Sequence, residues 1–361
     1  YLNLKDPATI KLMRGVMMGF GFKAQRLAHK AAKAVGLIQD SRAHPPATLG
    51  APTIKAQVIH FLNRPMPGNL PKRTSRALLD IEDDKVIPVI RNPQKTTEES
   101  DAVFYFPGCG SERLFSQVGL ATQAMLYEVG ATTVLPPGYL CCGYPQTSSG
   151  DEDKGQKITT DNRVLFHRVA NTLNYLDIKT VIVSCGTCMD QLQKYQFEKI
   201  FPGCRLLDIH EYLMEKGVRL EGVNGTRYMY HDPCHTPMKA YAPLAVTKAL
   251  MGQDVPLTDR CCGDAGSFAY SRPDIATQVK FRKQEEITDG AEKLRADGFA
   301  GEIKILTSCP ACLQGLSRYD DDADTTADYI VVEMARHLLG ENWASQYVDR
   351  ASNGGIERVL L

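Results

Sequence analysis

The sequence has 361 residues, of which 43% are hydrophobic and 23% charged, so it can bury a large core and form two domains with an additional arm. Its 42 basic residues balance its 42 acidic residues, and this balance disfavours nucleic acid or another polyanion as a partner. The longest early apolar stretch, Val16 to Phe22, is short, so we expect neither a signal peptide nor a transmembrane span.

The chain begins at Tyr1 rather than at methionine. We therefore expect either the later part of a longer polypeptide or a trimmed chain. Because no targeting segment is expected, we predict a cytoplasmic protein, or one that is held at a membrane by its partners.

Residues 1–40 are predicted to form a helical arm. Asp6 and Pro7 are typical of a helix start, and apolar residues follow at helical spacing with an interruption near Gly19. The arm is basic, and we expect it to pack on the body with a solvated face; the alternative is a docking surface for an acidic partner. Residues 41–100 contain eight prolines, which predict an extended, proline-rich linker.

From residue 101 onward, predicted strands alternate with predicted helices. The strands are expected at 102–106, 132–135 and 180–184 in the first half and at 228–231, 254–257 and 303–307 in the second. This alternation predicts an α/β fold with parallel sheets. We expect two pseudo-symmetric, Rossmann-like domains, at residues 101–222 and at residues 223–361 with the C-terminal tail.

Ten of the eleven cysteines form a repeat. Each half supplies a single cysteine, a Cys-Cys-Gly and a Cys-x-x-Cys, each at the end of a predicted strand. Parallel sheets bind ligands outside the carboxyl ends of their strands, so three loops in each half should converge on one metal site. The two sites should face each other across a pseudo-twofold interface. The candidate ligands are Cys109, Cys141, Cys142, Cys185 and Cys188 in the first half, and Cys234, Cys261, Cys262, Cys309 and Cys312 in the second.

The number of thiols favours iron–sulfur clusters. Soft thiolates prefer zinc, copper(I) or iron–sulfur clusters. Neighbouring Cα atoms are about 3.8 Å apart, closer than the roughly 4.4–6.8 Å of a disulfide, so Cys141 and Cys142 cannot easily pair. A structural zinc ion takes four ligands and would leave one of five thiols unused. We predict an iron–sulfur cluster in each half, with zinc as the alternative for one site.

Other residues near the cysteines have open roles. Cys204 has no counterpart in the second half and is expected to be a core thiol. His231 and His235 flank the single cysteine of the second half, and each is a candidate ligand, proton donor or hydrogen-bonding neighbour. The same alternatives apply to Tyr144 and Asp264, each of which follows a Cys-Cys-Gly. The sequence assigns no catalytic residue.

At these cysteines the chain resembles the paired cysteine-rich CCG domains of the heterodisulfide reductase catalytic subunit. Similar pairs occur in iron–sulfur subunits of glycolate oxidase, anaerobic glycerol-3-phosphate dehydrogenase and lactate-utilisation complexes. The 31 residues between Cys109 and Cys141 fit the family spacing, whereas the 42 between Cys142 and Cys185 exceed it. The second half departs further, with 26 residues between Cys234 and Cys261 and 46 between Cys262 and Cys309. The resemblance implies that the ten cysteines hold one four-iron, four-sulfur cluster per domain. In heterodisulfide reductase such clusters are non-cubane.

The arm and the closing segment also look like the C-terminal part of large bacterial flavin and iron–sulfur oxidoreductases related to D-lactate and glycolate dehydrogenases. This resemblance implies an oxidoreductase module that accepts electrons from FAD on a partner domain or subunit. A ferredoxin-like iron–sulfur module is a further expected partner, and a quinone or protein is the expected acceptor. The alternatives are direct reduction of a disulfide at a non-cubane cluster and a structural module that contains zinc.

Overall fold

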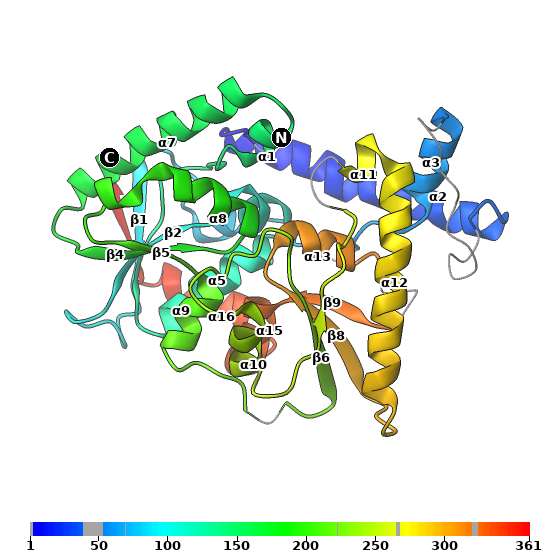
Figure 1. Cartoon of the computed structure of the whole chain (residues 1–361). Helices are drawn as coiled ribbons and strands as arrows, with labels where there is room; N and C mark the ends of the chain where they lie inside the picture. Colours follow the sequence, from blue (N-terminus) through cyan, green and yellow to red (C-terminus); the bar gives the residue numbers. More distant parts are fainter. Residues whose placement is uncertain (1–2, 39–52, 69, 222, 265–267, 320–323) are drawn as a thin grey trace.

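A computed structural model of the chain describes residues 3–38, 53–68, 70–221, 223–264, 268–319 and 324–361. Two sheets lie next to each other with helices around both, and the N-terminal helices extend along one side (Figure 1). The first part of the predicted linker, residues 41–52, lies outside the described residues.

Four adjacent parallel strands form one side of the first sheet, and three of them lead into a cysteine loop. In sheet order they are β3 (Thr132–Val134), β2 (Ala102–Phe106), β4 (Ile178–Val183) and β5 (Arg205–Asp208). Strands of this kind are buried on both faces, which explains their continuous apolar sequence. The predicted parallel α/β fold is confirmed.

Two antiparallel strands extend this sheet beyond the prediction. β1 (Val86–Ile90) pairs with β3, and β10 (Ile356–Leu360) pairs with β1. The C-terminal tail, predicted to belong to the second domain, therefore joins the first sheet. Strand β1 was not predicted because it contains Pro88, and proline lacks an N–H group for the ladder. The Pro88 carbonyl nevertheless accepts a 3.0 Å hydrogen bond from the Leu135 amide.

The second sheet repeats the four parallel strands of the first. In sheet order its strands are β7 (Leu257–Thr258), β6 (Thr226–His231), β8 (Glu302–Thr307) and β9 (Thr326–Tyr329). The strand predicted at residues 254–257 is found at Leu257–Thr258, so it is shorter than predicted and begins later in the chain. Pro256 has no N–H group for the ladder, and its carbonyl only accepts from the Tyr230 amide at 2.9 Å.

Helices connect the strands in both halves. The first half contains η2 (Gly110–Leu114), α5 (Ser116–Glu128), α6 (Tyr144–Ser148), α7 (Glu152–Thr172), α8 (Gly186–Leu192), η3 (Gln193–Tyr195), η4 (Phe197–Lys199) and α9 (Ile209–Glu215). The second half contains α10 (Pro243–Met251), α11 (Phe268–Ser271), α12 (Pro273–Arg295), α13 (Pro310–Leu316), α15 (Ile330–Leu339) and α16 (Trp343–Ser352). The equivalent helices α8 and α13 both begin inside a Cys-x-x-Cys motif.

The N-terminal arm is helical, as predicted. It consists of α1 (Pro7–Arg14), the π-helical segment η1 (Gly15–Gly21) and α2 (Phe22–Ala34). The Asp6 carboxylate caps α1 by accepting from the Thr9 amide at 2.7 Å. The interruption expected near Gly19 is the π-helical segment, so the backbone stays helical there.

The segment predicted as a linker also contains α3 (Ile54–Leu62) and α4 (Ser75–Leu79). Buried polar contacts attach this segment to its neighbours. The Gln25 amide of α2 donates to the Arg64 carbonyl at 2.8 Å, and the Arg64 guanidinium donates to Gln284 of α12 at 2.6 Å. These contacts link the arm to the second half of the molecule.

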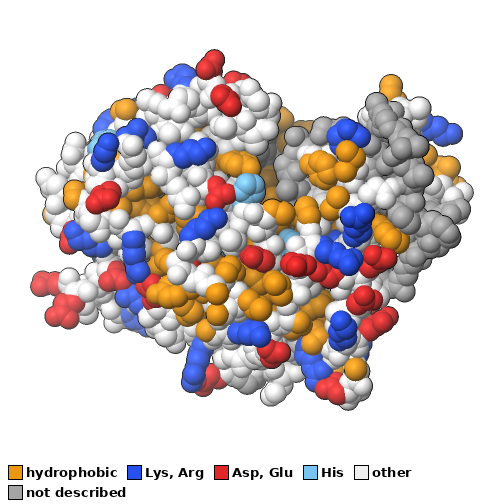
Figure 2. All heavy atoms as spheres, viewed as in Figure 1, with side chains coloured by type: hydrophobic (Ala, Val, Ile, Leu, Met, Phe, Trp, Pro, Cys, Tyr) orange, Lys and Arg blue, Asp and Glu red, His pale blue; other side chains and the backbone are white. Residues whose placement is uncertain are grey.

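The surface of the molecule carries charges of both signs. On the face shown in Figure 2, acidic and basic side chains are interspersed, in agreement with equal totals of 42 each. Among the described residues, no helix combines the length and the apolar character needed to cross a bilayer.

Two apolar core clusters each contain residues of both halves. Helix α15 of the second half packs against α5 and α9 of the first, and α10 packs against α9. At the centre of this contact the buried Tyr329 hydroxyl lies 2.7 Å from the carbonyl oxygens of both Ser184 and Ser308. These serines immediately precede the two Cys-x-x-Cys motifs, so one side chain connects both cysteine loops.

We expect the substitution Tyr329→Phe to lower the free energy of unfolding by about 1–3 kcal/mol, because two buried carbonyls lose a donor. The exposed Tyr175 provides a matched control, and Tyr175→Phe should change stability by less than about 0.5 kcal/mol. Urea denaturation followed by circular dichroism measures both values. Equal stability of the two variants would contradict this role of Tyr329.

Candidate metal centres

The five candidate thiols of the first half come together at the ends of β2, β3 and β4. All five are buried. The Sγ atoms of Cys109 and Cys141 are 3.9 Å apart, and Cys188 lies close enough to Cys142 and Cys185 that both raise its pKa. Three loops that are distant in sequence thus supply one group of sulfur atoms.

Two glycines let these loops approach closely. Gly108 has a φ of +65°, and a Cβ atom there would lie 2.6 Å from the Cys188 sulfur. Gly143 has a φ of +91°, and its Cβ atom would lie 2.9 Å from the Gly155 carbonyl oxygen. Any other residue would meet both backbone strain and a steric clash at these positions.

Polar side chains hold the vicinal cysteine pair from behind. The Asn162 amide donates to the Cys141 carbonyl at 2.8 Å, and the Tyr195 hydroxyl donates to the Cys142 carbonyl at 2.9 Å. The loop is therefore fixed through its backbone, which leaves the sulfur atoms free to bind a metal.

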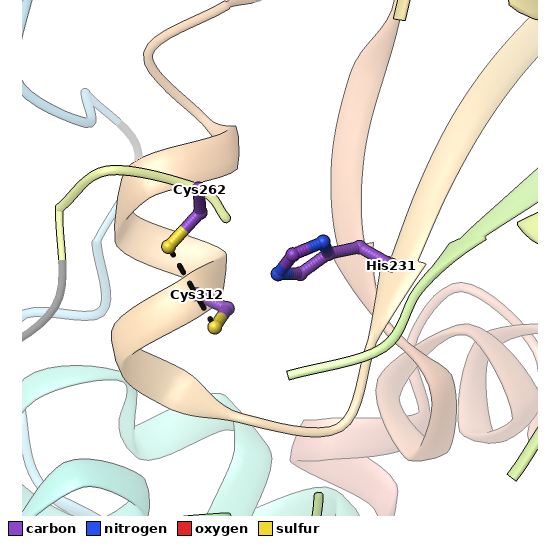
Figure 3. Close-up of side chains that lie close together, drawn as sticks. All are labelled: His231, Cys262 and Cys312. Carbon is purple, nitrogen blue, oxygen red and sulfur yellow. Dashed lines mark hydrogen bonds between the residues drawn. The ribbon is translucent and has the colours of Figure 1, made fainter. Parts of the chain in front are cut away.

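The second half reproduces this arrangement in part. Cys262, Cys309 and Cys312 are buried, Cys261 is partly exposed, and Cys234 is exposed. The Sγ atoms of Cys262 and Cys312 are 3.7 Å apart (Figure 3). The structure therefore groups these two buried thiols and leaves Cys234, a predicted ligand, at the surface.

A tyrosine supports the second loop as well. The Tyr319 hydroxyl donates to the Cys262 carbonyl at 3.2 Å, which is the contact that Tyr195 makes with Cys142. The two tyrosines are separated by about the same interval as the cysteine repeat. Neither tyrosine is among the predicted site residues, although this interval is a usable signal.

His231, at the end of β6, joins the buried thiols of the second half. A ring nitrogen of His231 and the Sγ atoms of Cys262 and Cys312 all lie within 4.8 Å of one another. Figure 3 shows the imidazole directed toward both sulfur atoms. These three residues form the most compact group of potential metal ligands among the described residues.

The two cysteine groups meet. The thiols of Cys185 and Cys309, one from each half, lie close enough that each shifts the pKa of the other. The residues next to these loops are also in contact across the interface, because a Cβ atom on Gly110 would lie 3.1 Å from the Cβ atom of Pro310. The predicted convergence of two sites on one interface agrees with this contact.

Crowding couples the ionisation of the thiols. Hydrogen bonds from Cys109 and Cys142 lower the pKa of Cys141 to about 3, while the hydrogen bond with Cys141, together with burial, raises the pKa of Cys109 well above its ordinary value. The contact with Cys185 raises the pKa of Cys309 to about 12. Neighbouring thiols cannot all ionise unless a cation balances their charge, and thiolate metal ligands must be deprotonated. The groups therefore fit a metal centre.

Cationic side chains surround the second group. Asp264, one of the residues with an open role, forms ion pairs with Lys280 at 2.8 Å and with Arg318 at 3.1 Å. Burial lowers the pKa of Lys283, and the Cys262 thiol is among the groups that oppose this shift. We conclude that the Asp264 carboxylate is paired with the two basic side chains. Lys283 lies close enough to the sulfur atoms to interact with their charge.

A series of hydrogen-bonded side chains connects the two halves close to both cysteine groups. The Tyr144 hydroxyl lies 2.9 Å from Nε2 of His235, and Nδ1 of His235 hydrogen-bonds to the Asp190 carboxylate. Burial raises the pKa of Asp190, but hydrogen bonds from His235 and Lys239 lower it by more, so the net pKa is below the ordinary value. His235 is thus a hydrogen-bonding partner of Tyr144.

The remaining cysteine behaves as a core thiol. Cys204 is partly buried and packs against the apolar core. Burial raises its pKa to about 11, so it stays protonated at neutral pH.

Two domain families match the sequence. The CCG family, described as a cysteine-rich domain, matches residues 103–193 and 228–317. A domain of unknown function matches residues 317–361. The two CCG matches contain both cysteine groups and begin in the equivalent strands β2 and β6.

Similar proteins are iron–sulfur proteins and oxidoreductase subunits. An iron–sulfur protein of Methanocaldococcus jannaschii is 28% identical over 58% of this chain and 40% of its own length. A fumarate reductase (CoM/CoB) subunit of Methanothermobacter marburgensis is 28% identical over 58% of this chain and 40% of its own length. Lactate utilization protein A of Exiguobacterium is 25% identical over 53% of this chain and 83% of its own length. The chain therefore spans less than half of the first two relatives.

We expect Gly186→Ala to disrupt the junction of the two groups, because a Cβ atom there would lie 1.5 Å from the His235 carbonyl oxygen. Overpacking of this kind costs about 1–3 kcal/mol of stability, and the displaced Cys-x-x-Cys loop should bind less metal. Gly19→Ala is the control, since no heavy atom lies within 4 Å of its Cβ position. Denaturant unfolding and metal analysis of both variants test the contact; unchanged stability and metal content in Gly186→Ala would contradict it.

Proposed function

Because this chain belongs to the CCG cysteine-rich domain family, we propose that it is the iron–sulfur electron-transfer module of a flavin-linked 2-hydroxyacid dehydrogenase. The substrate class would be of the D-lactate or glycolate type. Electrons would come from FAD on a partner domain or subunit and pass to a quinone or protein acceptor. The relative named for lactate utilization supports this substrate class.

The observation that carries this proposal is the group of five buried thiols in the first half. We assign Cys109, Cys141, Cys142, Cys185 and Cys188 as ligands of a four-iron, four-sulfur cluster. When bound, such a cluster supplies one-electron transfer. A single zinc ion would use only four of the five thiols.

The protein's own contribution is to bury, orient and connect the donor groups. The Tyr195 and Tyr319 hydroxyls hold the two vicinal pairs through their carbonyls, so the sulfur atoms keep fixed positions. The contact between Cys185 and Cys309 puts the two groups next to each other, an arrangement that suits a relay from one half to the other. The second group would hold either a second cluster or zinc.

The helical arm supports the existence of a partner. Large apolar side chains are exposed along α1, η1 and α2, among them Leu12, Val16, Phe20 and Leu27, and Phe20 is 74% exposed. Single exposed apolar residues are ordinary, but several along one helical segment are typical of an interaction surface. We propose that the flavin-containing domain or subunit covers this surface, and that a ferredoxin-like module completes the assembly.

Reduction of a disulfide is the second candidate function, favoured by the hydrogen-bonded side chains that connect the two halves. Reduction of R–S–S–R to two R–SH consumes two electrons and two protons. Burial, followed by the charge of Asp190, raises the pKa of Tyr144, so this hydroxyl retains its proton at neutral pH. His235 and Asp190 could then return a proton to it from solvent.

The primary test is metal and acid-labile sulfide analysis of the anaerobically purified chain with electron paramagnetic resonance. Two clusters would give about eight irons and eight sulfides, and one cluster with zinc about four of each and one zinc. Cys142→Ser should lose the first cluster, about four irons, whereas Cys204→Ser should match the wild type. Zinc without sulfide in the wild type would contradict the proposal.

The second candidate is tested by turnover of a small-molecule disulfide with dithionite as the electron source. Loss of a general acid typically costs about 10²–10⁴-fold in rate, so Tyr144→Phe should lower turnover by at least about 10²-fold without changing the iron content. Tyr175→Phe is the control. A turnover rate that is the same in both variants would exclude Tyr144 as the proton donor.

A further inference from the structure

The two halves differ at one position at the end of their first parallel strand. Phe106 ends β2, three residues before Cys109, and His231 ends β6, three residues before Cys234. Both side chains are completely buried. The repeat therefore places a titratable, metal-binding side chain in the second half where the first half has only a hydrocarbon ring.

The two single cysteines differ in the opposite sense. Cys109 is buried, with its sulfur 3.9 Å from that of Cys141, whereas Cys234 is exposed. In the second half, one potential ligand, Cys234, is therefore at the surface. Another potential ligand, His231, lies in the buried group instead.

The hydrogen bonds of His231 fix its tautomer. Nδ1 lies 3.3 Å from the Thr258 carbonyl oxygen, and because a carbonyl only accepts, Nδ1 carries the proton. Nε2 is buried, and its polar neighbour is the Cys262 thiol, whose pKa is lowered in part by His231. Metal-binding histidines usually donate their other ring nitrogen to a carbonyl or carboxylate in this way. The lone pair on Nε2 of His231 therefore faces the buried thiols of the second half.

That lone pair belongs to a compact set of donors. The ligand atoms of His231, Cys262 and Cys312 lie within 4.8 Å of one another, and Figure 3 shows the ring directed at both sulfur atoms. The two Sγ atoms are 3.7 Å apart. Metal–sulfur bonds of about 2.3 Å in tetrahedral geometry place two sulfurs roughly 3.8 Å apart, so the observed spacing fits ligands of one metal ion.

We propose that Nε2 of His231 binds the metal of the second half together with the Cys262 and Cys312 thiolates, in place of Cys234. The second site is then a mixed imidazole–thiolate centre, and the first site is held by thiolates alone. A neutral imidazole in place of an anionic thiolate removes one negative charge, and histidine ligands raise the potential of iron–sulfur centres that carry them. The inference rests on the proposed function only in requiring a metal in the second half.

The test uses the full chain, purified anaerobically with ¹⁵N-labelled histidine. Pulsed electron paramagnetic resonance detects nitrogen bound to iron, and X-ray absorption at the zinc edge detects nitrogen at about 2.0–2.1 Å from zinc. We expect a bound nitrogen in one of the two measurements. His231→Phe, which installs the residue of the first half, should abolish that signal and the metal of the second site, while the first site keeps its metal.

Two further variants keep the test decisive if His231→Phe folds poorly. Cys234→Ser should retain the nitrogen signal and the full metal content. His231→Cys should restore the metal without the nitrogen signal. Loss of the second-site metal in Cys234→Ser, with full retention in His231→Phe, would overturn the inference.

The outcomes separate this inference from the proposed function. Zinc with bound nitrogen and no sulfide would support the role of His231 and contradict the electron-transfer proposal. Iron and sulfide in both halves without bound nitrogen would support electron transfer and overturn the role of His231.

Discussion

Thiols buried in contact with one another are the constraint on which this structure depends. A buried charge is costly unless it is paired, and a thiolate next to another thiolate increases that cost. The pKa values show the consequence, since Cys141 ionises easily at the expense of Cys109, and Cys309 resists ionisation beside Cys185. A metal cation removes the conflict for every member of a group. The surrounding fold can accordingly be understood as a support that keeps the sulfur atoms together.

Both halves hold their cysteine loops with the same kinds of contact, but the residues around the thiols differ between the halves. Tyr195 and Tyr319 make the same contact with the two vicinal pairs, and Tyr329 lies between the two Cys-x-x-Cys loops. In contrast, Phe106 and His231 occupy equivalent strand ends. With the ligands proposed above, the common scaffold would carry two centres of different composition, which suits a module whose two ends exchange electrons with different partners.

The cysteine spacing predicted much of this arrangement. Each cysteine follows a short apolar run, and parallel strands release their loops at one edge of a sheet, so convergence on two adjacent groups could be expected. The sequence offered both Cys234 and His231 as candidate ligands but could not decide between them, because both lie within four residues of the strand end and the path of the loop determines which one is buried.

The pairing of β1 with β10 could not be predicted from the sequence either. It joins segments more than 260 residues apart, and Pro88 is typical of irregular structure rather than of an inner strand. Likewise, the attachment of Arg64 to Gln284 in α12 depends on buried polar contacts, for which a proline-rich segment gives no periodic signal. Such long-range pairings depend on tertiary contacts, for which no local periodicity gives a signal.

The most direct measurement is anomalous X-ray diffraction from anaerobically grown crystals, with data collected at the iron and zinc absorption edges. The central claim predicts one iron-rich peak among the five thiols of the first half. It also predicts a second metal peak between Nε2 of His231 and the sulfur atoms of Cys262 and Cys312. Absence of anomalous metal density at both groups, with the ten cysteines free or paired as disulfides, would contradict it.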